Sequence, residues 1–95
     1  MEKKDSRIAV IGIIIEDREK AEPVNSLLHQ YGEYIIGRMG IPYRERQVNI
    51  ISVVLDAPAD IISALAGKLG RLPGVSSKAI YSKKKITGRN LDNGK

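Results

Sequence analysis

The sequence predicts an α+β domain of the ferredoxin-like type, with the element order βαββαβ and two helices on one face of a four-stranded antiparallel sheet. Two observations predict this fold. Residues 8–15 and 50–55 are apolar at almost every position, and glycines and prolines divide the rest of the 95-residue chain into two helical segments and two shorter strands. A strand without polar alternation must be covered on both faces, so the two apolar segments are expected to be the central strands.

The first half of the chain is predicted to form strand, helix and strand. The first strand covers residues 7–16. Pro23 fits only near the start of a helix, so the helix should begin at residues 20–22, and Gly32 is typical of the left-handed residue that ends one. Its apolar stripe is Ala21, Val24, Leu27, Leu28 and Tyr31. The second strand is predicted over residues 33–38.

The second half is predicted to repeat the pattern. A loop over residues 39–47 precedes the third strand at 48–56. Pro58 lies in the first turn of the second helix, Asp60 complements the helix dipole, and Gly70 ends the helix. The buried face of this helix is predicted to be Ile61, Ile62, Leu65 and Leu69. The last strand covers residues 75–81.

Two helices can cover only one face of such a sheet. The covered side chains are either Ala9, Ile11, Ile13 and Ile15 of the first strand or the opposite alternate set. The remaining set would leave an apolar surface, and monomers seldom expose such surfaces above about a few hundred Å². We therefore expect a homodimer or a higher homo-oligomer, with sheets packed face to face or edge to edge. A monomer with a modestly exposed sheet is the alternative.

The charge of +5 is concentrated near the C-terminus. Residues 83–95 hold five basic residues and one acidic residue, whereas residues 1–82 hold eleven basic and ten acidic residues. We expect one domain over residues 1–82 and a flexible basic tail over 83–95, which could attract nucleic acid weakly and in a salt-sensitive way. Sequence-specific DNA binding by this chain alone is not expected, since only residues 1–6 precede the first strand.

The composition argues against several other classes of protein. The chain has no cysteine, which excludes disulfides and cysteine-ligated metal centres, and its one histidine, His29, cannot form a multi-histidine site. No catalytic residue and no cofactor are predicted. The acidic side chains that could act in catalysis lie at strand ends or helix starts, where helix capping and the helix dipole already explain their presence. The apolar run at residues 8–15 is far shorter than the ~20 residues that span a membrane, and no signal peptide is visible, so a cytoplasmic protein is expected.

The loop predicted over residues 38–47 is the candidate site. It is long for a connection between paired strands and mixes apolar side chains with three arginines. The candidate residues are Arg38, Met39, Gly40, Ile41, Pro42, Tyr43, Arg44 and Arg46, with Leu72, Pro73, Gly74 and Val75 of the turn before the last strand. The loop could close over a small anionic ligand, which guanidinium groups suit, or pack across a subunit interface. A merely exposed hairpin would leave Ile41 and Tyr43 without a role.

Four segments of the chain resemble the iron-only hydrogenase system regulators. They are the string Ile-Ile-Gly-Arg-Met-Gly-Ile-Pro-Tyr at residues 35–43, the strand and Ala-Pro at residues 50–58, the segment at residues 63–70 and the Leu-Pro-Gly-Val turn at residues 72–75. The resemblance covers residues 7–82. It implies an ACT-like domain related to the C-terminal regulatory domain of nickel-responsive repressors, and it implies oligomers. The ribbon-helix-helix segment and the metal-ligating histidines and cysteine of those repressors are missing here.

The function expected from the sequence is therefore a non-enzymatic transcriptional regulator or sensor that forms oligomers and binds a small ligand. Two alternatives remain open. One is a structural module that docks on a regulatory protein partner. The other is a weak nucleic-acid binder that acts through the basic tail.

Overall fold

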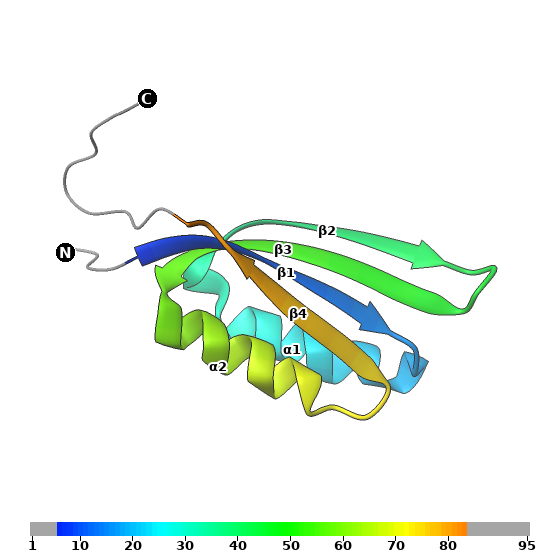
Figure 1. Cartoon of the computed structure of the whole chain (residues 1–95). Helices are drawn as coiled ribbons and strands as arrows, with labels where there is room; N and C mark the ends of the chain where they lie inside the picture. Colours follow the sequence, from blue (N-terminus) through cyan, green and yellow to red (C-terminus); the bar gives the residue numbers. More distant parts are fainter. Residues whose placement is uncertain (1–5, 84–95) are drawn as a thin grey trace.

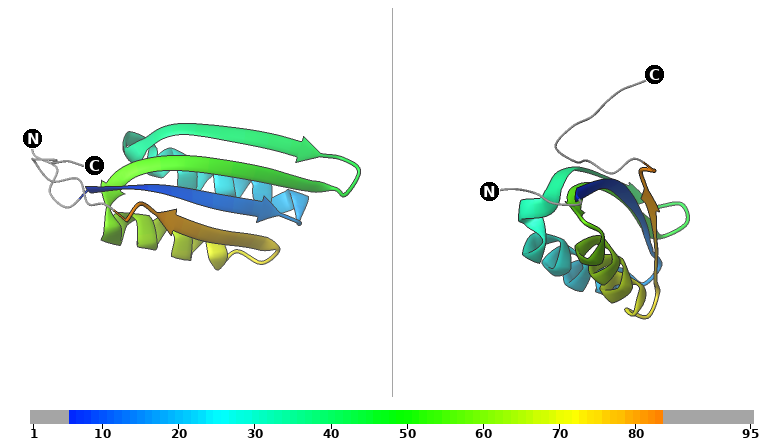
Figure 2. Two further views of the ribbon diagram at one scale, coloured as in Figure 1. Left: turned by 45° about the horizontal axis from the view of Figure 1, so that its top comes forward. Right: turned by 60° about the vertical axis from the view of Figure 1, so that its left-hand side comes forward.

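The computed structural model describes residues 6–83 and confirms the ferredoxin-like βαββαβ fold (Figure 1). Its elements are β1 (Ser6–Ile15), η1 (Arg18–Lys20), α1 (Ala21–Gln30), η2 (Gly32–Tyr34), β2 (Ile35–Tyr43), β3 (Val48–Pro58), α2 (Ala59–Gly70) and β4 (Val75–Tyr81). The sheet has the order β2-β3-β1-β4, and every neighbouring pair is antiparallel. Both α-helices lie on one face of the sheet (Figure 2). Residues 84–95 of the predicted tail lie outside the described residues.

The buried core lies between the sheet and the two α-helices. It takes one alternate set from each central strand, namely Ala9, Ile11, Ile13 and Ile15 from β1 and Ile51, Val53, Leu55 and Ala57 from β3. The helices add Val24, Leu28, Ile62, Leu65 and Leu69. Each of the larger side chains contributes about 1.5–3 kcal/mol when fully buried. The structure thus decides which of the two alternate sets on β1 faces the helices.

The helix ends differ from the prediction. The α1 helix begins at Ala21 as expected, but its C-cap is Tyr31, and Gly32 starts the 3₁₀ turn η2 without a left-handed conformation. Gly70 is the last residue of α2 rather than a left-handed cap. Pro58 is the N-cap of α2, one position before its first turn. These glycines are not needed as caps, because the chain continues into 3₁₀ or turn geometry that satisfies the last carbonyls.

The predicted long loop over residues 38–47 is wrong. Strand β2 continues to Tyr43, and only residues 44–47 form a turn, in which Gln47 has a positive φ of 58°. Gly40 and Pro42 are poor strand formers, but β2 is an edge strand, where one side of the backbone needs no partner and proline is tolerated. Pairing with the long strand β3 keeps this segment extended. The β2–β3 hairpin reaches past the ends of β1 and of the helices (Figure 1).

Neither α-helix of the described residues is long and apolar enough to cross a membrane.

Candidate functional site

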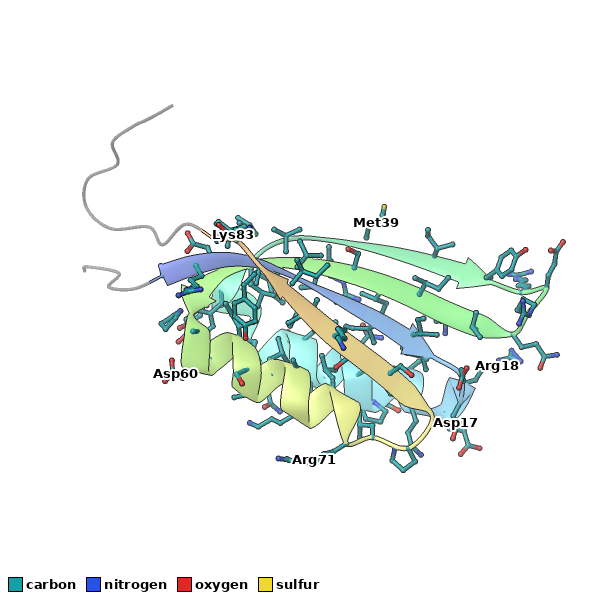
Figure 3. All side chains as sticks on the ribbon, viewed as in Figure 1. Asp17, Arg18, Met39, Asp60, Arg71 and Lys83 are labelled. Carbon is teal, nitrogen blue, oxygen red and sulfur yellow. The ribbon has the colours of Figure 1, made fainter. Side chains whose placement is uncertain are left out.

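The face of the sheet that the helices leave uncovered is largely apolar. Strand pairing aligns its side chains in rows: Ile41, Ile50 and Ile14 form one, and Val54, Val10 and Ile80 another. We call this surface the open face; its apolar side chains are Ile8, Val10, Ile14, Met39, Ile41, Tyr43, Val48, Ile50, Val54 and Ile80. Ile41 is 47% exposed, Ile14 43% and Ile80 69%. Met39 projects away from the helices (Figure 3).

The open face carries little charge. At its paired positions the charged residues are Lys78 on the edge strand β4 and Asp56 near the far end of β3, where the Ser6 hydroxyl donates to Asp56 Oδ1 (2.9 Å). Gly12 and Ser52 lie between the apolar rows. The centre of this surface therefore offers apolar contact without a fixed charge.

Strand alternation divides the predicted site residues between the two faces of β2. Met39, Ile41 and Tyr43 lie on the open face. Arg38, Gly40 and Pro42 have the opposite parity and lie on the face toward the helices. The three arginines of the sequence prediction therefore do not converge on one point, because Arg38 lies in the strand and the other two lie in the turn.

Arg38 is held against α1. Its Nη2 donates to Asn25 Oδ1 (2.7 Å), and Asn25 Nδ2 donates to the Ala21 carbonyl oxygen (3.0 Å). These residues border a shallow groove of about 240 Å³ under β2. The walls are mostly apolar and include Ile15 and Ile51. Because one of its donors is already used, Arg38 is less available to a ligand than a free guanidinium would be.

A larger cavity of about 580 Å³ lies between the hairpin and η1, and we call it the hairpin cavity. It is lined by Arg18, Pro42, Tyr43, Arg44, Gln47, Val48 and Asn49. Pro42, Tyr43 and Arg44 were predicted as site residues. Arg46 was also predicted but does not line the cavity. Sequence reasoning missed Arg18, which lies just past the end of β1 (Figure 3). The predicted topology could have indicated it, because this end of β1 must lie beside the β2–β3 turn in an antiparallel sheet.

The turn at residues 72–75 does not line the hairpin cavity, but it packs against the segment that carries Arg18. The Glu16 N–H donates to the Gly74 carbonyl oxygen (2.7 Å). Gly74 has a φ of +77°, and a Cβ there would lie 2.6 Å from Asp17 Cβ. Glycine is therefore required at this position both by the backbone conformation and by the close approach of Asp17. Through these contacts the turn packs against the two residues that precede Arg18.

The described residues contain no cluster of three or more side chains suited to holding a metal ion. Burial, followed by the charge of Glu33, raises the pKa of Tyr34 above its usual value of 10.0. Tyr34 is in η2, after the C-terminal end of α1, whereas the hairpin cavity is next to η1 at the opposite end of that helix. The polar side chains that line the hairpin cavity are those of Arg18, Tyr43, Arg44, Gln47 and Asn49.

Comparison with known proteins identifies the family. Residues 7–79 match the family model TM1266-like, described as "Iron-only hydrogenase system regulator, putative". The chain belongs to the TM1266-like family. A solved structure titled as that of the uncharacterized protein TM1266 from Thermotoga maritima is 46% identical, with a TM-score of 0.78, and the match covers 82% of this chain and 99% of that one. No curated protein matches the chain.

The TM1266-like match confirms the family that the residue strings at 35–43 and 72–75 indicated. Both strings lie within the matched residues. The first string forms the edge strand β2, and the second forms the turn that packs against the residues before η1.

Proposed function

We propose that this TM1266-like chain is a non-enzymatic regulatory domain that acts as a homo-oligomer assembled through its open face. The description of the family supports a regulatory role. The observation that carries the assembly is the open face itself, with its aligned rows of exposed aliphatic side chains on all four strands. An ACT-like sensory role, in which assembly responds to a small ligand, fits the same arrangement.

The size of the open face suits a subunit interface. Four strands at a spacing of about 4.8 Å, over about seven residues at roughly 3.3 Å each, give a flat footprint of roughly 400–500 Å² before side-chain relief is counted. Apolar patches of about 300–600 Å² are the largest on typical monomers. Patches of this size are often functional, and the flat footprint is a lower bound for the surface that could be set against the ~800 Å² per partner of a standard interface.

The chemistry of the open face favours a second copy as its occupant. A two-fold interface sets one surface against itself, so like charges at its centre would repel. Here Lys78 and Asp56, of opposite sign, lie at the margins, and the centre is apolar. A copy of the same surface therefore meets no charge conflict at the centre.

Two alternate substitutions on β1 test this proposal. Val10 is on the open face, whereas its neighbour Ile11 is fully buried under the helices. Val10→Asp should give a folded monomer, because the charge disrupts only the interface. Ile11→Asp should abolish cooperative unfolding, because it places a charge in the core. Sedimentation velocity and circular dichroism measure the two effects.

A stable wild-type monomer at micromolar concentration would overturn the proposal. The second candidate function, a docking module for a different regulatory protein, uses the same open face. It would be favoured if the pure chain is monomeric and a partner protein binds wild type but not Val10→Asp. The third alternative, weak nucleic-acid binding through the tail, rests on residues 83–95, of which 84–95 lie outside the described residues.

A further inference from the structure

We infer that the hairpin cavity is a binding site for a small molecule with a carboxylate or phosphate group, held between Arg18 of η1 and Arg44 of the β2–β3 turn. This inference deepens the proposed function, since it gives the class and the position of the ligand that a sensory domain would bind. The cavity is lined by residues of this chain, and two of them, Tyr43 and Val48, also belong to the open face.

Both guanidinium groups are free to receive an anion. Within the described residues, neither the Arg18 nor the Arg44 guanidinium has a hydrogen-bonding or ion-pair partner. Arginine stays charged at every physiological pH, so both positive charges persist at the cavity. Two unpaired cations that line one cavity attract an anion more strongly than either would alone.

Four acidic residues lie near the two arginines in the sequence, namely Glu16, Asp17, Glu19 and Glu45, and none of them lines the cavity. Two of these carboxylates also have partners elsewhere. Asp17 Oδ1 accepts the Glu19 N–H (3.0 Å), and Asp17 Oδ2 lies 3.7 Å from Lys20 Nζ. Glu45 Oε1 accepts the Tyr43 hydroxyl (2.9 Å). Neither Asp17 nor Glu45 lines the cavity, so the charge that faces the cavity is positive.

The backbone at each arginine is fixed before any ligand binds. Asp17 caps η1 immediately before Arg18, and its carbonyl oxygen accepts the Lys20 N–H (2.8 Å). The Gln47 N–H donates to the Arg44 carbonyl oxygen (3.1 Å). A ligand would therefore need to order only the two arginine side chains, which lowers the entropic cost of binding.

The remaining walls define what else the ligand could carry. The volume of about 580 Å³ falls in the range of about 300–1,000 Å³ that small-molecule sites occupy. Gln47 and Asn49 contribute amide side chains, and Pro42 and Val48 contribute apolar surface. A compact metabolite with one anionic group and a partly apolar body matches these walls better than a bare inorganic ion does.

Isothermal titration of the full chain with inorganic phosphate, succinate and phenyl phosphate tests the site. Arg18→Gln and Arg44→Gln should each weaken binding of the organic anions by roughly 10- to 100-fold, which is the usual cost of a lost charge-assisted hydrogen bond. The matched control is Arg46→Gln, which removes the same charge from the same turn outside the cavity and should change affinity by less than about threefold. Arg18→Lys should recover part of the affinity, which a folding defect would not allow.

Three outcomes would overturn the inference. The first is that no probe binds wild type at a probe concentration of about 10 mM, which would mean a Kd too weak for a sensory site. The second is an equal loss in Arg46→Gln, which would mean diffuse charge attraction. The third is binding of a short DNA duplex with the same arginine dependence and no binding of small anions, which would make the surface a nucleic-acid contact.

The same titration on Val10→Asp separates this inference from the proposed function. A monomeric Val10→Asp chain that binds anions like wild type supports the cavity as a site within one chain. If wild type is monomeric yet binds anions through both arginines, only the proposed assembly fails. If wild type forms oligomers and binds no anion, only the cavity inference fails.

Discussion

Gly74 connects the turn before β4 to the segment that carries Arg18. Its φ of +77° strains any residue with a Cβ, and that atom would lie 2.6 Å from Asp17 Cβ. We expect Gly74→Ala to lower the free energy of unfolding by about 1–3 kcal/mol, because strain and displacement of Asp17 add together. Urea denaturation measures this change.

Gly67 provides the matched glycine for that experiment. It lies within α2 and is exposed, and a Cβ at this position would meet no atom within 4 Å. Gly67→Ala should therefore raise the free energy of unfolding by up to about 1 kcal/mol through helix propensity. If Gly74→Ala is as stable as wild type, the close approach to Asp17 does not matter for folding.

At the scale of elements, β2 shows what sequence reasoning can and cannot reach. The order of strands and helices was predicted because Pro23, Gly32 and Pro58 lie near element boundaries. The length of β2 was not, because Gly40 and Pro42 disfavour a strand locally and only pairing with β3 keeps them extended. The covered face of β1 could not be assigned either, since both of its alternate sets are apolar.

The candidate site was only partly predictable for a related reason. A contiguous segment at residues 38–47 was expected to act together, but an extended strand sends successive side chains to opposite faces. Arg38 therefore faces α1 while Ile41 and Tyr43 lie on the open face. Arg18 comes from a distant part of the sequence and lines the same cavity as Arg44 only because of the sheet topology.

The end of β2 should contribute to assembly through Tyr43, which is 43% exposed on the open face. Tyr43→Ala should raise the dissociation constant of the oligomer by about tenfold or more, because aromatic side chains often dominate interfaces. Tyr43→Phe keeps the ring and loses only the hydrogen bond to Glu45, so it should assemble like wild type. Sedimentation equilibrium distinguishes them, and Tyr43→Ala with an unchanged dissociation constant would exclude this residue from the interface.

At the scale of the whole molecule, an oligomer built through the open face makes stability depend on concentration. The unfolded chain is monomeric, so mass action favours the folded dimer by about 1.4 kcal/mol per mole of dimer for each tenfold rise in protein concentration. For two chains of this size that corresponds to a rise in Tm of about 4 °C. Calorimetry over a hundredfold range of concentration should reveal this rise in wild type.

Val10→Asp is the control for that measurement, because it should remove the open-face interface without disturbing the buried side chains of β1. Its Tm should be lower than that of wild type and independent of concentration, since folding of a monomer has no concentration term. The difference between the two chains should therefore widen as the concentration increases. Equal, concentration-independent Tm values for both chains would mean that the open face is not buried between copies. The occupant of the open face would then have to be a partner other than a second copy.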